Sequence, residues 1–398
     1  MSRTDRRLRI AYLCDFDPRD LNLYSGGNAR LFAALSRHAG DVHVLPSHWG
    51  PLEPLNRIIH KTPDRINIRL RWRVHLALGW MINRRITREL AKGQYDVLFC
   101  AYSFQSLHRV RVPGTMISAY TADATPMVYK NSVIGRSFGS YIAASRMIDP
   151  LIERAERSVF QQTDLLLWPS EWLRDRAQDR YALQPEQSVV VPWGANIDRP
   201  DGAPDAATLS VTRPLQILFV GRDWIAKGGP LVVQTLALLR EEGIDARLTV
   251  VGCQPPEAAL TLLGGTVTVY RSLDKANPKQ LAQFQSLLRR SHFMMMASME
   301  SWGFAFCEAS AYGLPSLCLR AGGVPVSDAI NGHALPIGAE AAEFAAILRD
   351  YLGRPAAYQR LRQTSRQQYD SVLNWDVWGQ RVGQLLQDGV RTRRGAGQ

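Results

Sequence analysis

The sequence predicts an α/β protein with two parallel, doubly wound sheets in tandem. Short apolar runs alternate with amphipathic helical stretches along the chain, which is the pattern of buried parallel strands joined by helices. A stretch at 192–214, rich in proline, glycine and small polar residues, separates two such series. The length of 398 residues also suits two domains better than one.

The individual elements follow from these runs. In the first half, a glycine loop opens a helix in "YSGGNARLFAALSRHA" (24–39), and the expected strands are 8–16, 41–46, 95–102, 114–120 and 164–170. In the second half, the expected strands are 215–221, 246–252, 267–272, 292–298 and 316–323, with helices at 230–242, 278–290 and 304–313. An amphipathic helix is expected at 374–390, followed by a frayed basic end, "RTRRGAGQ".

The composition is that of a globular protein, with 46% apolar and 21% charged residues. A formal net charge of +12 favours anionic partners such as nucleotide phosphates or acidic lipids. The five cysteines contain no C-x-x-C pair, which argues against a disulfide framework and a zinc knuckle and favours a reducing cytosol. Because no uncharged apolar run is long enough to span a membrane, we expect any membrane role to be peripheral.

Residues 57–92 stand apart because they combine ten lysines and arginines with interleaved apolar residues, among them Trp72 and Trp80. A basic amphipathic helix of this kind can lie on an anionic membrane surface. A solvated helix whose other side packs on the sheet explains the same pattern. The sequence leaves both interpretations open.

The motif "VGRDWIAKGG" (220–229) places Arg222 and Lys227 in a loop between an expected strand and an expected helix. Two cations beside a helix N-terminus suit a diphosphate. The loop is not a P-loop, because G-x-x-x-x-G-K-[ST] is absent. Basic loops of this kind also occur without a ligand, so this motif alone does not decide between a site and a plain turn.

The motif "ASMESWGFAFCEASAYGLP" (297–315) holds two glutamates in an otherwise apolar stretch. Glu300 is expected at the C-terminal edge of the sheet, where open α/β sheets bind ligands. Gly303 permits a close backbone approach, and the amides of 303–306 at the helix start suit a phosphate. Glu308 can accept hydrogen bonds from the vicinal hydroxyls of a ribose, and Glu300 from those of a sugar. Alternatively, Glu308 only caps its helix and Glu300 is merely exposed.

With these motifs the chain resembles retaining glycosyltransferase family 4. "ESWGFAFCEASAYGLPSLCLRAGGVP" resembles the donor-site signature with its E-x7-E spacing, and "FVGRDWIAKGG" resembles the pyrophosphate loop. "SGGNARL" resembles the N-terminal glycine loop, and "VVVPWGANID" resembles the entry to the second domain. The resemblance implies the GT-B fold, in which two Rossmann-like domains face a cleft: an acceptor domain at 1–194 with helix 374–390 crossing back to it, and a donor domain at 195–373.

The resemblance also implies roles for single residues. Arg222 and Lys227 would neutralise the diphosphate, and Glu308 would bind the ribose. The segment "YRSLDK" (270–275) would border the nucleobase. The implied catalytic residues are Arg222, Lys227, Glu300 and Asp123. The implied donor-binding residues are Gly26, Gly27, Arg222, Lys227, Arg271, Leu273, Glu300, Gly303, Phe304, Ala305 and Glu308.

Three positions depart from the family pattern. Where many family members carry a histidine, this chain has "TADATP", so that Thr121 or Asp123 takes its place; Asp123 is equally explained as a turn or cap residue. Val326 stands where a glutamate is usual, and Trp193 stands where an asparagine is common. These positions bear on the sugar and on turnover rather than on nucleotide binding.

The predicted function is transfer of a sugar, with retention, from a UDP- or GDP-sugar to a lipid-linked or polysaccharide acceptor at the cytoplasmic membrane face. Two cations and a helix dipole would stabilise the departing nucleoside diphosphate, and no metal or other cofactor is expected. The main alternative is a relative that binds sugar nucleotide or membrane without turnover.

Two other classes fit less well. A nicotinamide or flavin oxidoreductase would need G-x-G-x-x-G after the first strand, and the sequence has none there. A nucleic-acid-binding module is not supported, because the basic residues are dispersed and match no RNA- or DNA-binding motif.

Overall fold

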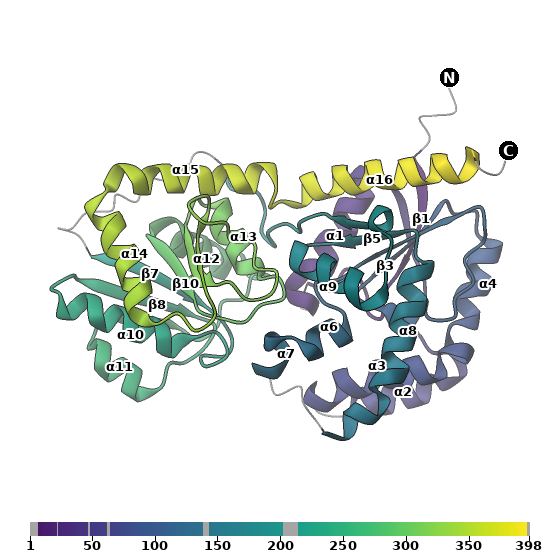
Figure 1. Cartoon of the computed structure of the whole chain (residues 1–398), viewed down its shortest axis with the longest axis horizontal. Coiled ribbons are helices and arrows are strands. Elements are labelled where there is room, and N and C mark those ends of the chain that lie inside the picture. The colour runs from purple at the N-terminus through teal and green to yellow at the C-terminus, as the bar shows by residue number, and fades with distance from the viewer. Residues whose placement is uncertain are drawn as a thin grey trace. The chain divides into compact units, whose positions relative to one another are not determined.

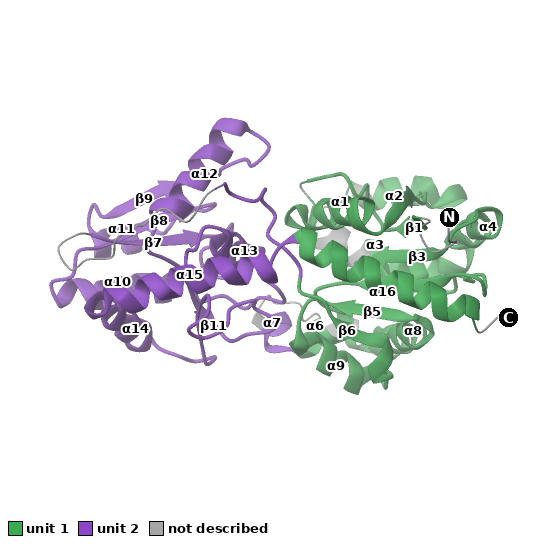
Figure 2. Ribbon diagram, turned by 90° about the horizontal axis from the view of Figure 1, so that it is seen from above, with its two compact units in different colours: residues 1–131, 141–192, 375–398 green, residues 132–140, 193–374 purple. Residues whose placement is uncertain are grey.

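The computed structural model describes residues 7–21, 23–46, 48–61, 64–137, 143–201 and 214–395. The chain divides into two compact units (Figure 2). Unit 1 comprises residues 1–131, 141–192 and 375–398, and unit 2 comprises residues 132–140 and 193–374. Each unit holds one six-stranded parallel sheet with helices packed on it (Figure 1), so the predicted α/β fold with two parallel sheets is confirmed.

The sheet of unit 1 has the strand order β2-β1-β3-β4-β5-β6. Its strands are β1 (Leu8–Leu13), β2 (Gly40–Val44), β3 (Val97–Ala101), β4 (Ile117–Thr121), β5 (Leu165–Trp168) and β6 (Ser188–Val190). Every residue of β3 and β4 is buried. Helices cover both faces of a parallel sheet, so β3 (VLFCA) is a continuous apolar run, and β4 (ISAYT) contains only the small polar residues Ser118 and Thr121 among its apolar ones.

The helices of unit 1 are η1 (Leu23–Gly26), α1 (Gly27–His38), η2 (Gly50–Leu52), α2 (Glu53–His60), α3 (Asp64–Ile82), α4 (Arg84–Lys92), α5 (Phe104–Leu107), α6 (Pro126–Asn131), η3 (Ala143–Ile148), α8 (Asp149–Gln162), α9 (Glu171–Tyr181), η4 (Pro185–Gln187) and α16 (Trp375–Gly395). An aromatic cluster fills the core between α8, α9 and the sheet. The Phe160 ring lies within 5.8 Å of the Tyr120, Trp168 and Tyr181 rings.

The sheet of unit 2 has the strand order β12-β11-β10-β7-β8-β9. Its strands are β7 (Leu215–Val220), β8 (Ala246–Val251), β9 (Val267–Tyr270), β10 (Phe293–Met296), β11 (Ser316–Leu319) and β12 (Gly332–Leu335). Its helices are α7 (Val133–Ser137), α10 (Gly229–Glu241), α11 (Glu257–Leu263), α12 (Pro278–Arg290), α13 (Phe304–Ala311), α14 (Ala341–Gly353) and α15 (Pro355–Ser371). The methionine run of β10 is fully buried core, as the sequence predicts.

The C-terminal helix α16 (Figure 1) packs within unit 1 against α1 and β4. The expected frayed end at 391–398 is wrong for the described residues, because the helix continues to Gly395. Arg393 pairs with Asp164, and Arg394 pairs with Asp96 at 2.6 Å. Both aspartates directly precede strands, so they present carboxylates at the N-terminal edge of the sheet to the end of the helix.

Residues 57–92 do not form one helix, which corrects the expectation. They are divided among α2, α3 and α4, and α3 and α4 meet at Asn83. The Asn83 amide donates hydrogen bonds to the backbone carbonyls of Gln105 (3.1 Å) and His108 (2.8 Å), and its Oδ1 atom lies 3.0 Å from His75 Nε2. In the described part of the chain, no helix has the length and apolarity required to cross a membrane.

Candidate functional site

The candidate site in unit 2 lies at the C-terminal ends of two adjacent parallel strands. Strand β7 ends at Val220 and leads into the loop with Arg222 and Lys227, whereas β10 ends at Met296 and leads into the loop with Glu300. Because parallel neighbours end at the same edge of a sheet, these two loops emerge side by side. The sheet topology thus brings together predicted residues that are distant in sequence.

Lys227 and Glu300 form an ion pair between these loops. Lys227 Nζ donates to Glu300 Oε1, and Ser298 Oγ donates to the same oxygen at 2.9 Å. The Lys227 and Glu300 side chains are 25% and 15% exposed, so the pair is largely shielded but can be reached. The Glu300 backbone is fixed by a parallel bridge to Gly322. A sugar or phosphate at this edge would meet a preorganised cation and anion.

Two glycines allow the loops to pack this closely. Gly228 has φ +77°, and a Cβ atom there would lie 2.4 Å from the Ala297 carbonyl oxygen after β10. Gly303 has φ +101° and is the N-cap of α13. Both positions combine a left-handed backbone with close neighbours, which only glycine tolerates without strain.

Helix α13 starts at the same edge and carries Phe304, Ala305 and Glu308. The Phe306 amide donates to the Gly303 carbonyl at 3.1 Å, so it is used within the first turn, contrary to the expectation that all four amides of 303–306 are available. The Phe304 ring stacks on Trp193, with centroids 5.8 Å apart and planes 5° apart. Trp193, which departs from the family pattern, therefore supports the start of α13.

Glu308 lies on α13 with its side chain only 3% exposed, and Lys275 Nζ donates to its Oε1 atom at 2.5 Å. Lys275 belongs to the predicted nucleobase segment 270–275 after β9. No role is predicted from the sequence for Lys275 itself. The only feature of the sequence that points to Lys275 is its place within this segment. Its partner Glu308 is 33 positions away in the chain.

The other predicted residues of unit 2 lie on neighbouring loops. Arg222 is exposed in the β7–α10 loop, and Leu273 is partly exposed after β9. Arg271 Nε donates to Gln254 Oε1 at 3.1 Å, which joins the loops that follow β8 and β9. All of these loops follow C-terminal strand ends of the same sheet, as predicted.

In unit 1 the glycine loop has an unusual backbone. Tyr24 and Ser25 have φ +51° and +55°, and Gly26 has φ +83° directly before α1 begins at Gly27. The Tyr24 ring stacks on Tyr102, which also has a positive φ of +62°, with centroids 4.0 Å apart. Non-glycine residues in this conformation are uncommon and gather at functional sites, so the loop is a functional candidate.

Thr121 and Asp123 follow the end of β4. The Thr121 side chain is fully buried, and its hydroxyl donates to the Leu167 carbonyl at 2.6 Å. Asp123 is partly exposed, and together with burial its charge raises the pKa of Tyr102. Of the two residues considered for the place of the histidine, Asp123 is therefore the one whose side chain a ligand can reach.

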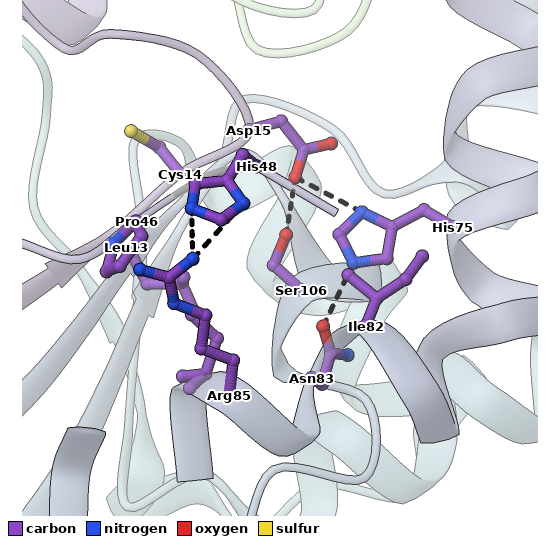
Figure 3. A pocket seen from close by; sticks show the side chains of 11 residues that line it. Leu13, Cys14, Asp15, Pro46, His48, His75, Ile82, Asn83, Arg85 and Ser106 are labelled. Carbon is purple, nitrogen blue, oxygen red and sulfur yellow. Dashed lines mark hydrogen bonds and ion pairs between the residues drawn. The ribbon is translucent and has the colours of Figure 1, made fainter. Parts of the chain in front are cut away.

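Sequence reasoning missed a buried polar cluster at the end of β1 (Figure 3). Asp15 accepts hydrogen bonds from the side chains of Gln105 and Ser106 on α5. His75 on α3 has Nδ1 3.6 Å from Asp15 Oδ1 and Nε2 3.0 Å from Asn83 Oδ1. His75 therefore lies between Asp15 and Asn83, which places it inside the buried cluster. The sequence signal is a single acid directly after the first strand.

Arg71 belongs to the same cluster and changes the interpretation of the basic segment. Its side chain is buried, with Nη2 donating to the Asp15 carbonyl at 2.7 Å and Nε donating to Asn56 Oδ1 at 3.1 Å. Its guanidinium lies 4.2 Å from the centroid of the Phe16 ring. Arg71 therefore holds α3 to the end of β1 and does not face a membrane.

Among the residues that the structure describes, no three His, Cys, Asp or Glu side chains gather as metal ligands would. Function without a metal or another cofactor remains a prediction. The five cysteines are free thiols, and burial raises the pKa of Cys14 to about 12.

Comparison with known families decides the class of protein. Residues 28–199 match the model described as Glycosyltransferase Family 4, and residues 214–353 match the model described as Glycosyl transferases group 1. Together these two matches cover most of the chain; the first lies mainly in unit 1 and the second lies in unit 2. The chain belongs to the group 1, family 4 glycosyltransferases. The resemblance found in the sequence, and with it the class of glycosyltransferases, is thereby confirmed.

Relatives of this glycosyltransferase are moderately similar in sequence. D-inositol 3-phosphate glycosyltransferase of Corynebacterium kroppenstedtii is 27% identical over an alignment of 221 residues that covers 51% of this chain and 48% of the relative. Glycogen synthase of Mycobacterium tuberculosis is 25% identical over 246 residues, which are 61% of this chain and 58% of the relative. The chain spans about half the length of the curated relatives it matches.

The fold is shared with solved glycosyltransferases. Sucrose-phosphate synthase from Thermosynechococcus elongatus superposes with a TM-score of 0.64 at 18% identity, covering 97% of this chain and 100% of that chain. The predicted two-domain GT-B fold is thus confirmed as a fold class. Anabaena Alr3699/HepE, solved in complex with UDP-glucose, superposes with a TM-score of 0.58 at 15% identity, covering 96% of this chain and 100% of that chain.

Proposed function

We propose that this glycosyltransferase moves a sugar, with retention and without a metal, from a UDP- or GDP-sugar to a lipid-linked or polysaccharide acceptor at the cytoplasmic membrane face. The donor part of the proposal rests on one observation. At one edge of the unit 2 sheet, each of the two predicted glutamates is held by a lysine: Glu300 by Lys227, and Glu308 by Lys275.

This arrangement suits the three parts of a sugar nucleotide. Lys227 and the exposed Arg222 supply positive charge for the diphosphate, assisted by the N-terminus of α13. Glu308 accepts from the ribose hydroxyls, and Glu300 accepts from the transferred sugar. Anabaena Alr3699/HepE, which shares the fold, was solved with UDP-glucose, which favours a nucleotide sugar as donor.

The proposed chemistry is a displacement in which the acceptor hydroxyl attacks from the face that the diphosphate leaves. The bond from the anomeric carbon to the phosphate oxygen breaks, the bond to the acceptor oxygen forms, and a phosphate oxygen takes the acceptor proton. Negative charge grows on the leaving diphosphate, where fixed cations and a helix dipole stabilise the transition state more than the ground state. No step in this scheme needs a metal.

The membrane part of the proposal rests on exposed groups of α2–α4. Trp80 is 46% exposed and has the Arg84 guanidinium 5.3 Å from its ring centroid, and Ile58 is 63% exposed. Aromatic and cationic side chains together suit the headgroup region of an anionic membrane. The buried Arg71 makes no part of this surface.

Binding of nucleotides tests the donor part directly. The full chain is titrated calorimetrically with UDP, GDP and ADP in the presence of EDTA. Either UDP or GDP is expected to bind more tightly than the other two nucleotides. Binding should be lost in Glu308→Ala. Binding without turnover toward any sugar donor would support the alternative of a non-catalytic relative. If none of the three nucleotides binds, the proposal is wrong.

A further inference from the structure

Glu308 is a nearly buried carboxylate with one strong partner. Its side chain is 3% exposed, and in the described part of the chain Lys275 is the only residue that hydrogen-bonds to it. An ionised carboxylate removed from water is unfavourable unless a counter-charge or hydrogen bonds compensate it. Lys275 therefore supplies the counter-charge and the hydrogen bond for the Glu308 side chain at this position.

Lys275 is itself held in place, unlike most surface lysines. The loop around it is tied by the Ala276 amide, which donates to Asp274 Oδ1 at 2.9 Å. Asn277 then caps α12 by accepting from the Lys279 amide at 3.0 Å. On its other side, Lys275 Nζ lies 4.8 Å from the centroid of the Phe284 ring. The capped loop and the cation–π contact hold the Lys275 ammonium group beside the Glu308 carboxylate.

The hydrogen bond also orients the carboxylate. Lys275 engages Oε1, and a carboxylate has about four acceptor positions on its two oxygens. Acceptor capacity on Oε2 is therefore left for hydroxyl donors. Vicinal hydroxyls of a ribose are donors of the required spacing, whereas a deoxyribose offers one fewer.

We propose that Lys275 is a positioning residue for nucleotide recognition, which holds the Glu308 carboxylate oriented so that the site selects ribonucleotides over deoxyribonucleotides. This inference rests on the proposed function and gives a role to a residue that was predicted only to lie in the segment bordering the nucleobase. Lys275 acts through Glu308 and does not take part in the chemistry.

The test compares UDP and GDP with their 2′-deoxy forms by calorimetric titration of the full chain. The wild type is expected to prefer the ribonucleotide by roughly tenfold or more, since hydrogen bonds to charged groups have this magnitude. Lys275→Met should weaken ribonucleotide binding by roughly ten- to a hundredfold and bring the ribose-to-deoxyribose ratio close to one. Glu308→Gln should lower the same ratio, and Lys275→Arg should restore part of it.

Lys279→Met is the matched control, because Lys279 is exposed four residues further along and forms no ion pair with Glu308. It should leave the ratio unchanged. The inference is overturned if Lys275→Met keeps the wild-type ratio while Glu308→Gln loses it, or if Lys275→Met binds the ribonucleotide more tightly. If the wild type binds neither nucleotide, the proposed function itself fails, and the inference fails with it.

Discussion

Lys227 donates a hydrogen bond to Glu300 across two loops whose residues are 73 positions apart in the chain. The two side chains are predicted to serve different parts of a donor, the diphosphate and the sugar. Their pairing couples these two subsites, because each side chain is the counter-charge of the other. Substitution of one should therefore affect recognition of both parts.

Replacement of Lys227 by methionine is expected to weaken diphosphate binding. The affinity for UDP or GDP should fall by roughly ten- to a hundredfold, because a charge-assisted contact is lost, while uridine or guanosine alone should bind nearly as before. Calorimetric titration of both ligands measures the difference. Lys279→Met serves as the control. An equal loss for the nucleoside and the diphosphate would show that Lys227 acts through the fold rather than on the phosphates.

Glu156 should make the stability of unit 1 depend on pH. It is fully buried, accepts from Tyr181 Oη at 2.9 Å and from the Met127 amide at 3.2 Å, and burial raises its pKa from 4.5 to about 8. The folded state thus keeps a proton that the unfolded state loses. Its contribution to the free energy of unfolding is fully present below pH 4.5 and is lost as pH rises toward 8, by up to about 1.4 kcal/mol per pH unit.

Urea unfolding of the wild type and Glu156→Gln from pH 5 to 8.5 measures this effect. Glutamine does not titrate, so the variant should lack the pH-dependent contribution of Glu156 to the free energy of unfolding. The difference in unfolding free energy between the two proteins should therefore change with pH. Parallel pH profiles for the two proteins would contradict the assignment.

The two arginines near the end of α16 should stabilise unit 1. Arg394 pairs with Asp96, which also accepts from the Arg9 amide at 2.8 Å, and Arg393 pairs with Asp164. Because both arginines are more than a third exposed, the double variant Arg393→Ala/Arg394→Ala is expected to lose only about 1 kcal/mol of unfolding free energy. Chemical denaturation measures it.

Arg391→Ala is the control for that experiment, since among the described residues Arg391 pairs only with the exposed Asp388 of its own helix. It should leave the unfolding free energy within error. If the double variant is equally neutral, the helix end is held by its packing alone.

Membrane binding should depend on the exposed basic residues of α4. Arg84 and Arg88 lie one turn apart on that helix. With about 1 kcal/mol for each basic residue near an anionic surface, Arg84→Gln/Arg88→Gln should bind anionic vesicles roughly thirtyfold more weakly. Sedimentation with vesicles of phosphatidylglycerol and phosphatidylcholine measures it. Arg349→Gln/Arg360→Gln in unit 2 is the charge-matched control. If both double variants bind vesicles equally well, the basic surface of α4 is not the membrane-binding surface.

The sequence predicted most of the fold because its signals are local. Apolar runs bounded by turn residues locate the strands within a few positions, as for β7, expected at 215–221 and observed at Leu215–Val220. The two glutamates and Lys227 are predicted as site residues because Lys227 and Glu300 lie in loops that follow strands and Glu308 lies in a helix that follows such a loop. Parallel topology then forces such positions to one edge.

What the sequence did not predict depends on partners far away in the chain. The helical end of α16 relies on Asp96 and Asp164, and the end of α3 relies on Asn83 contacting the 105–108 segment. Similarly, the sequence shows Arg71 only as one of ten basic residues in the segment 57–92, and not its buried contacts with Asn56 and Asp15. Neither composition nor periodicity carries information on such pairs.

The most direct measurement is nucleotide release by the purified protein from a panel of UDP- and GDP-sugars, with and without extracted membranes and with EDTA present. Release of one nucleotide that is insensitive to EDTA and is lost in both Glu308→Ala and Lys227→Ala is the predicted result. Release that requires a divalent metal, or that persists undiminished in both variants, would contradict the proposed donor site.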